Sequence, residues 1–272
     1  MDVKLGICNF CTPGVGVFAP RIVAEAGLDG MSVEYGTYEQ GFPLTQPYLQ
    51  QLYLEEQQKY GIDYPNVGCS GFDFIPFHAR PGTKYYGIVR DALKNAVKAA
   101  ANMGIPMVFV PGFNESEVKS QEDLEYAASM FQYFCDEAGE KGISVGYENQ
   151  LSAKEQHTIF ELVDRPNFGM FYDSNNFYFQ KGWNQAEILD ATYDIMLPQL
   201  HVKDGKKGSI ASAILGSGDT DFYATIDVLK KKEYKGWLIL ENLYYLSPMR
   251  DLHEDWFELM RQDVAALKAA VR

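Results

Sequence analysis

The chain has no hydrophobic run long enough to cross a membrane. No stretch reaches the roughly 18 uninterrupted apolar residues that a spanning helix needs. The opening segment MDVKLGICNF contains an early lysine but lacks the long apolar core of a secretory signal. We therefore expect a cytoplasmic protein that is not associated with a membrane.

Cysteine and basic residues are also scarce. Four cysteines in 272 residues do not form a disulfide framework, and Cys8 and Cys11 have no second pair to complete a zinc site. We interpret both as small apolar residues of the first strand and its loop. With 24 Lys and Arg against 37 Asp and Glu, the formal charge of −13 argues against a surface that binds nucleic acid.

The sequence does contain a regular alternation of short β-like runs and helical stretches. Apolar residues three and four apart predict helices between the strands, and the clearest are Tyr85–Met103, Asp123–Lys141 and Leu252–Val271. No proline-rich or serine-rich linker divides the chain. The eight predicted strands are Val3–Asn9, Gly30–Glu34, Pro65–Ser70, Met107–Val110, Ile143–Glu148, Phe168–Asp173, Met196–His201 and Trp237–Glu241.

This alternation predicts one α/β domain over residues 1–272, a (β/α)8 TIM barrel with a parallel sheet. Dividing 272 residues among eight units gives 34 per unit, enough for one strand, one helix and two loops. Glycines before several predicted strands, such as Gly104 and Gly142, favour the barrel over an open doubly wound sheet. The nearest glycine cluster, Gly14-Val15-Gly16, lacks the third glycine of a dinucleotide-binding loop.

Four polar residues end four consecutive predicted strands in the second half of the chain: Glu148, Asp173, His201 and Glu241. Each alone fits a helix cap, a salt bridge or a hydrogen-bonded histidine, but four on successive strands are hard to explain as packing. In a barrel, the carboxyl ends of the strands meet at the catalytic face. Three carboxylates and one imidazole suit a divalent ion, so we predict one bound ion, with Mn²⁺ preferred and Co²⁺, Mg²⁺ or Zn²⁺ as alternatives.

The same residues carry a family resemblance. They resemble the motifs of the xylose isomerase-like barrels, and among these the sugar phosphate isomerase/epimerase group of ketose 3-epimerase and hydroxypyruvate isomerase type. The resemblance implies a (β/α)8 barrel, one divalent ion on the four strand-end residues, and proton transfer by the two glutamates. The segments that carry it are Tyr147-Glu148-Asn149, Asp173-Ser174-Asn175-Asn176, His201-Val202-Lys203-Asp204-Gly205, Leu215-Gly216-Ser217-Gly218-Asp219 and Leu240-Glu241-Asn242.

The resemblance thus implies a metal-dependent isomerase or epimerase that acts on a sugar or sugar phosphate. Such a reaction removes a weakly acidic proton alpha to a carbonyl, which a chelated metal ion assists by stabilising the developing enediolate. Glu148 and Glu241 end predicted strands five and eight, about 135° apart around the barrel. They can therefore flank a substrate as two opposed bases.

Four further residues are candidates for substrate binding. Lys203 can direct its ammonium at a substrate oxygen or pair with Asp204, and Lys207 can bind a hydroxyl or phosphate or lie in a solvated loop. His78, after the third strand, can donate a hydrogen bond. Asn176 stands where many relatives have a histidine; its amide can bind a sugar hydroxyl but is a poorer metal ligand and no acid–base catalyst.

Three other functions stay open. A keto-sugar or keto-inositol dehydratase begins with the same proton abstraction and then expels a hydroxyl group. Barrels resembling the apurinic endonucleases hold several zinc ions on extra histidines, whereas this chain has four histidines and a strongly negative charge. A non-catalytic sugar-binding barrel would have no need of two opposed glutamates.

The identity of the sugar, the need for a phosphate group and the oligomeric state also stay open. Gly216-Ser217-Gly218 can form a phosphate cradle on backbone amides or a simple tight turn. An aromatic content of 14% is compatible with an apolar interface between copies, so a homo-oligomer is one expectation.

Overall fold

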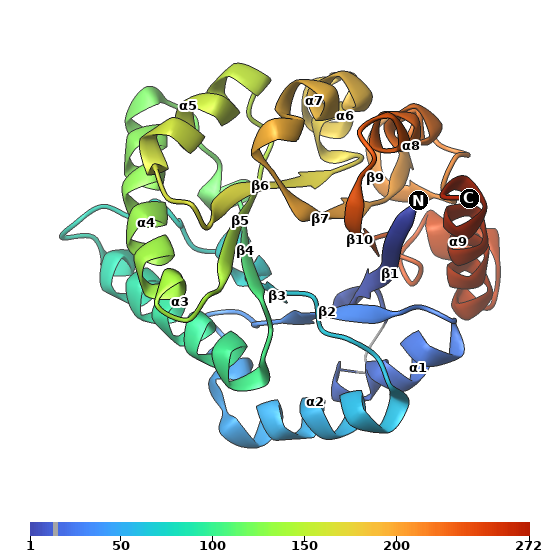
Figure 1. Cartoon of the computed structure of the whole chain (residues 1–272), viewed down its shortest axis with the longest axis horizontal. Helices are drawn as coiled ribbons and strands as arrows, with labels where there is room; N and C mark the ends of the chain where they lie inside the picture. The colour runs from blue at the N-terminus through green and yellow to red at the C-terminus, as the bar shows by residue number, and fades with distance from the viewer. Residues whose placement is uncertain (13–15) are drawn as a thin grey trace.

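Eight parallel strands close into a barrel in the computed structural model, which describes residues 1–12 and 16–272. Around the barrel the strands follow the order β1-β10-β7-β6-β5-β4-β3-β2 (Figure 1). This order confirms the predicted barrel and excludes the open doubly wound sheet. In the Gly14-Val15-Gly16 cluster considered for a dinucleotide-binding loop, Gly14 and Val15 lie outside the described residues. The strands are β1 (Asp2–Cys8), β2 (Gly30–Glu34), β3 (Val67–Gly68), β4 (Met107–Pro111), β5 (Ser144–Glu148), β6 (Phe168–Asp173), β7 (Met196–Val202) and β10 (Lys235–Leu240).

The predicted strand boundaries agree with these to within two residues. The third strand differs most: Pro65–Ser70 shrinks to Val67–Gly68, because Pro65 has no N–H for a ladder and the chain turns at Ser70 into a 3-10 helix. Glu241 falls just beyond β10, but its N–H donates to Val202 O at 3.0 Å and continues the ladder. The side chain therefore still projects from the barrel rim.

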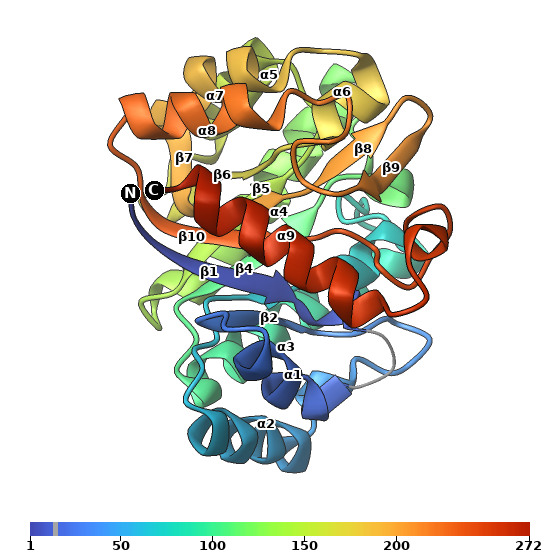
Figure 2. The ribbon, with the colours of Figure 1, turned by 90° about the vertical axis from the view of Figure 1, so that its right-hand side faces the viewer.

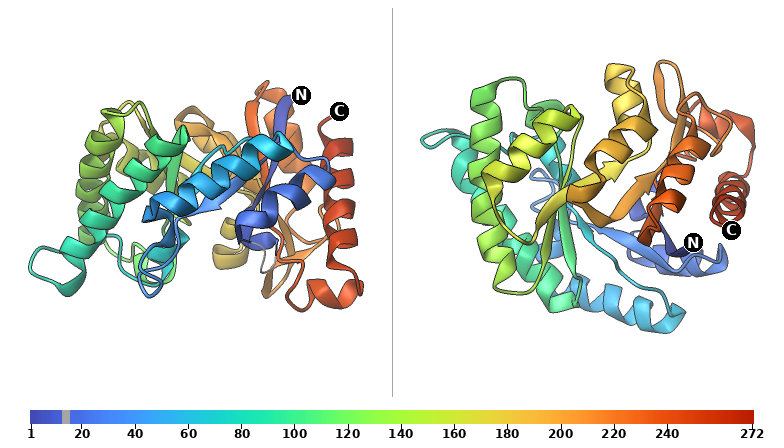
Figure 3. Two further views of the ribbon diagram at one scale, coloured as in Figure 1. Left: turned by 90° about the horizontal axis from the view of Figure 1, so that it is seen from below. Right: turned by 45° about the horizontal axis from the view of Figure 1, so that its top comes forward.

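The α-helices form an outer layer around the strands, and Figure 3 shows α1 and α2 running along the outside of the barrel. Gly104 ends α3 in the left-handed region with φ 68°, as the sequence predicts. The helices are α1 (Ala19–Glu25), α2 (Pro47–Tyr60), α3 (Lys84–Met103), α4 (Gln121–Gly139), α5 (Ala153–Val163), α6 (Asn176–Lys181), α7 (Gln185–Thr192), α8 (Phe222–Lys231) and α9 (Trp256–Ala270).

Two helices begin at other residues than the sequence predicted, because capping side chains fix their first turns. Helix α4 starts two residues before Asp123, since Ser120 Oγ accepts a hydrogen bond from Asp123 N at 3.1 Å. Helix α9 starts at Trp256 instead of Leu252, since Asp255 caps it and the preceding turn is a 3-10 helix. The 3-10 helices are Asn9–Cys11, Gly16–Phe18, Pro43–Thr45, Ser70–Asp73, Asn114–Ser116, Tyr193–Ile195 and Met249–Leu252.

An antiparallel hairpin follows β7, made of β8 (Asp204–Lys206) and β9 (Ser209–Ala213). The sequence analysis missed it, because its strands are short and its polar, glycine-containing turn resembles a loop. Ala211 N donates to Asn175 Oδ1 at 3.1 Å, which ties the hairpin to the segment after β6. The hairpin thereby becomes part of the rim around the carboxyl ends of the strands.

The two termini lie side by side (Figures 1 and 2). The Met1 ammonium donates to Val271 O at 2.7 Å, and Figure 2 shows α9 lying alongside β1 and β10. This contact holds the end of α9 next to the start of β1, beside β10, the strand that leads to Glu241. Within the described part of the chain, every helix is too short or too polar to span a membrane.

Candidate active site

The structure brings the four predicted strand-end residues together at one point. One oxygen or nitrogen atom from each of Glu148, Asp173, His201 and Glu241 lies within 4.8 Å of the others. His201 Nδ1 is the centre of the group, at 3.2 Å from Glu148 Oε1, 3.2 Å from Glu241 Oε2 and 3.9 Å from Asp173 Oδ2. We call these four residues the carboxylate–histidine cluster. Their donor atoms are those that a hard or borderline divalent ion prefers.

The backbone at the start of α6 orients Asp173. Its Oδ1 accepts hydrogen bonds from the N–H groups of Asn175 at 2.7 Å and Asn176 at 2.8 Å. Oδ2 therefore faces the cluster, where it is buried and has no hydrogen-bond donor, although the Lys203 ammonium lies 3.1 Å away. Such an oxygen is costly to bury. Burial, only partly opposed by the Lys203 charge, accordingly raises the pKa of Asp173 above its usual range.

Two neighbours hold the glutamates, and they differ in charge. Asn176 Nδ2 donates to Glu148 Oε1 at 2.8 Å. Lys203 donates to Glu241 Oε2 and is itself almost fully buried. The lysine thus pairs with Glu241 and Asp173, and not with Asp204 as one prediction allowed.

The cluster lies in the wall of a cavity of about 430 Å³. Glu148, His201, Lys203 and Glu241 line it on one side, and Asp73 adds a further carboxyl group. The remaining wall is largely apolar and includes five phenylalanines, so the cavity presents a compact polar group inside an apolar frame, as small-molecule sites often do. The aromatic lining residues are Phe10, Phe74, Phe109, Phe113 and Phe179.

The comparison with known families agrees with this geometry. Residues 20–270 match the family model described as a xylose isomerase-like TIM barrel. The chain belongs to this family. The resemblance carried by the strand-end motifs is therefore confirmed.

Relatives of this xylose isomerase-like barrel include an epimerase and a dehydratase. The chain is 23% identical over 248 residues to the 2-epi-5-epi-valiolone 7-phosphate 2-epimerase of an Actinoplanes species. The aligned region covers 90% of this chain and 88% of the relative. An inosose dehydratase of Glaesserella parasuis is 24% identical over 151 residues, about half of either chain (47% and 51%).

Solved structures share the fold at low sequence identity. The D-allulose 3-epimerase of a Methylomonas species, in complex with D-allulose, has a TM-score of 0.76 at 17% identity and covers 99% of this chain and 97% of its own. The IOLI protein with a bound zinc atom has a TM-score of 0.77 at 16% identity and 98% coverage of both chains. Both likenesses confirm the barrel.

Two of the four predicted substrate-binding residues line the cavity of this xylose isomerase-like barrel, namely Asn176 and Lys203. The other two lie elsewhere. His78 Nε2 faces Asp123 Oδ1 of α4 at 3.7 Å, and Lys207 sits in the exposed turn of the hairpin. Substrate contacts for these two residues have no support in this geometry.

The glycine motif after the hairpin has a structural role. Gly216 N and Gly218 N donate to Asp204 Oδ2 at 2.9 and 3.0 Å, and Thr220 Oγ1 donates to Asp204 Oδ1 at 2.8 Å. A Cβ on Gly218 would lie 2.1 Å from Asp204 Oδ1, so only glycine fits. Because Asp204 occupies these amides, the sequence-based option of a phosphate cradle is wrong and the motif forms a turn.

The sequence analysis missed two acidic groups on the opposite side of the barrel. Burial raises the pKa of Glu34, at the end of β2, to about 7, and Ser70 Oγ donates to its Oε2. Burial, with the charges of Glu148 and Glu241, also raises the pKa of Asp73 to about 7. Glu34 could have been found, since it ends a predicted strand just as Glu148 does. Asp73 had no such signal, because it follows the shortest strand.

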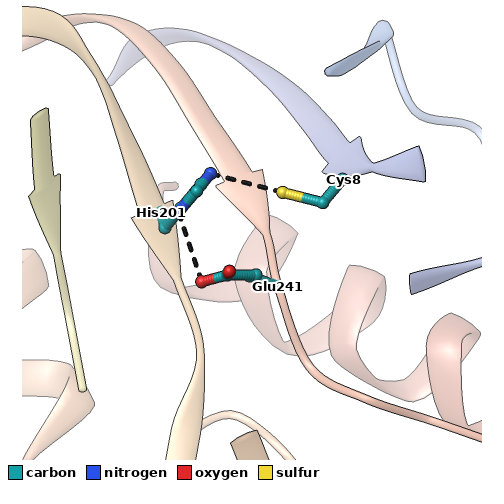
Figure 4. A group of neighbouring side chains, drawn as sticks. All are labelled: Cys8, His201 and Glu241. Atoms are coloured by element: carbon teal, nitrogen blue, oxygen red, sulfur yellow. Dashed lines mark hydrogen bonds and ion pairs between the residues drawn. The ribbon is translucent and has the colours of Figure 1, made fainter. Parts of the chain in front are cut away.

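Cys8 also meets the cluster. Its Sγ lies 3.2 Å from His201 Nε2, and both side chains are buried. Figure 4 shows Cys8 and Glu241 at different ring nitrogens of His201. The sequence correctly predicted a small buried residue in the first strand but gave no sign of this contact.

Proposed function

We propose that this protein is a divalent-metal-dependent epimerase or isomerase that moves the proton alpha to the carbonyl of a polyhydroxy ketone. The observation that carries the proposal is the convergence of two glutamates, from β5 and from the end of β10, on one histidine in the cavity wall. The 2-epimerase relative from Actinoplanes and the D-allulose 3-epimerase of the same fold support it.

The cluster fits a divalent ion. Three buried carboxylates gather around one ammonium and one imidazole, and Asp173 Oδ2 lacks a hydrogen-bond donor. Glu148, Asp173, His201 and Glu241 would hold the ion, and their oxygen-rich donor set favours Mn²⁺ over softer metals. When bound, a divalent ion supplies Lewis-acid polarisation of the substrate carbonyl.

The chain itself supplies the proton transfer. One glutamate removes the alpha proton and the other returns a proton to the opposite face, which inverts the carbon. Glu148 is held by the neutral amide of Asn176, whereas Glu241 is held by the Lys203 ammonium. An ammonium lowers the basicity of its carboxylate more than an amide does. We therefore assign proton removal to Glu148 and proton return to the Lys203–Glu241 pair, in which the lysine ammonium holds the proton that Glu241 passes to the substrate.

The cavity favours a substrate without phosphate. Among the described residues that line it, Lys203 is the one lysine or arginine, and Asp173 and Glu241 already engage its ammonium. Gly216 and Gly218 direct their amides at Asp204. A phosphate dianion would therefore meet carboxylates instead of charge-assisted donors. The aromatic wall suits the C–H faces of a free sugar or cyclitol.

A dehydratase is the second candidate, and Asp73 favours it. This acid lines the cavity with a pKa of about 7, so a substantial fraction is protonated at neutral pH and can protonate a departing β-hydroxyl. The inosose dehydratase relatives match about half of this chain. Asp73→Asn separates the candidates: a dehydratase would lose water elimination yet keep alpha-proton exchange.

The test is the incorporation of solvent deuterium at the alpha carbon of ketoses and keto-inositols, measured by NMR on protein loaded with Mn²⁺. We expect exchange in the wild type and a loss of about 10²- to 10⁴-fold in Glu148→Gln, which lacks the base that removes the proton. Glu241→Gln should lose formation of the inverted product by a similar factor, while exchange at the face of Glu148 continues. Glu161→Gln, an exposed glutamate of α5, is the matched control and should exchange like the wild type. A wild-type rate of exchange in Glu148→Gln, or of inverted product in Glu241→Gln, would remove that glutamate from the mechanism.

The same assay with each ketose and its phosphate ester tests the substrate preference. Faster exchange of the free sugar is expected. A preference for the ester would overturn the argument from the cavity charges while leaving the proton-transfer mechanism intact.

A further inference from the structure

The two ring nitrogens of His201 face different partners. Nδ1 points at the carboxylates of Glu148 and Glu241, each at 3.2 Å. Nε2 points away from them, at Cys8 Sγ, 3.2 Å distant (Figure 4). The ring is buried, and Phe109 and Phe171 pack edge-to-face with it at centroid distances of 5.2 and 4.7 Å.

This arrangement restricts which nitrogen can carry the proton. A neutral imidazole has one N–H and one lone pair, so a histidine that binds a cation through Nδ1 must carry its proton on Nε2. That N–H is buried and needs an acceptor. Among the residues that the structure describes, the polar partner of Nε2 is Cys8 Sγ.

A thiol suits this position for an electrostatic reason. Metal-binding histidines usually donate their second N–H to a carboxylate, a carbonyl or water. A further carboxylate here would add negative charge to a site that already buries three, with Lys203 as their ammonium partner. The Cys8 sulfur accepts a hydrogen bond without adding charge.

We propose that Cys8 is a positioning residue that accepts the His201 Nε2–H and so presents the Nδ1 lone pair to the ion. The proposal rests on the metal site of the proposed function. It also states that Cys8 is not itself a ligand. Cys8, His201 and Glu241 do lie close enough to be a second ligand set, but Cys8 and Glu241 face different nitrogens of the ring. One ion cannot use both nitrogens at once.

The test is the affinity of the full-length, metal-stripped protein for Mn²⁺, measured by isothermal titration calorimetry. Cys8→Ala removes the acceptor and should weaken binding about 10- to 100-fold, the usual effect of losing such a partner. Cys8→Ser keeps an acceptor and should bind more tightly than Cys8→Ala. Cys135→Ala, a buried free thiol on α4 away from the cluster, is the control for loss of a buried thiol and should bind like the wild type.

The Co²⁺ spectrum provides an independent measurement. We expect the wild-type protein to show no thiolate-to-cobalt charge-transfer band. Wild-type Mn²⁺ affinity in folded Cys8→Ala would overturn the positioning role, and a charge-transfer band that disappears in Cys8→Ser would show Cys8 to be a ligand. If Cys8→Ala does not fold, Cys8→Val replaces it, because valine fills the space without an acceptor. A wild-type protein that binds no ion would refute the metal site itself, and with it the role of Cys8.

Discussion

Replacing Lys203 with methionine should destabilise the metal-free protein severely, since Lys203 is the ammonium partner of a buried acidic cluster. Its side chain is 5% exposed and lies between the carboxylates of Asp173 and Glu241, which are 0% and 14% exposed. Methionine keeps the length of the side chain and removes the charge. Both carboxylates then lose their cation at a site where their side chains are largely buried.

The size of the loss follows from this burial. Breaking a buried ion pair by removing one partner costs about 3 to 5 kcal/mol. For a domain of this size, each kcal/mol lowers the melting temperature by about 2 to 4 °C, so Lys203→Met should melt about 6 to 20 °C below the wild type in the presence of a chelator. A divalent ion restores positive charge between the same carboxylates. Saturating Mn²⁺ should therefore remove much of the deficit.

The assay is urea and thermal unfolding followed by circular dichroism, with chelator and with Mn²⁺. Lys232→Met is the control, because Lys232 pairs with Asp190 at 2.8 Å on the surface and its loss should have no measurable effect. A loss below about 1 kcal/mol for Lys203→Met in chelator would refute the argument from burial. An equal deficit with and without Mn²⁺ would show that no ion binds between these carboxylates.

Two further predictions concern the metal and the hairpin. Elemental analysis of protein reloaded with Mn²⁺ should give about one ion per chain. The His201→Ala variant should lose this ion, because the His201 Nδ1 lies at the centre of the cluster. Two or three zinc ions in the wild type would instead favour a phosphodiesterase. Asp204→Asn should cost about 1 to 3 kcal/mol, because the amide group cannot accept from Gly216, Gly218 and Thr220 together. Urea unfolding and hydrogen exchange at these glycine amides measure this loss, and unchanged protection in the variant would contradict it.

Much of the fold could be predicted from the sequence because the signals were local. Short apolar runs for the strands, apolar residues three and four apart for the helices, and glycines at helix ends such as Gly104 follow directly from backbone geometry. The hairpin after β7 was missed because short polar strands gain their stability from tertiary contacts, such as that of Ala211 N with Asn175. The length of β3 was overestimated because Pro65 has no N–H for the ladder and the chain turns at Ser70.

The candidate site also has a part that the sequence predicted and a part that only the structure shows. Strand-end position on four consecutive strands, together with metal-ligand chemistry, singled out Glu148, Asp173, His201 and Glu241, because parallel strands of a barrel deliver their last residues to one face. The sequence could not show that Cys8 reaches His201, which lies 193 positions further along the chain, or that Asp73 enters the cavity. Such contacts depend on how side chains from distant strands meet.

The sequence by itself determined the barrel and the residue types of the cluster, since both follow from periodicity and strand order. Only the tertiary structure decided how each group is used. It turned the amides of Gly216 and Gly218 onto Asp204, paired Lys203 with Glu241 and directed Asn176 at Glu148. The physical reason is that hydrogen bonds and charges act over a few ångströms in space, and separation along the chain does not fix that distance.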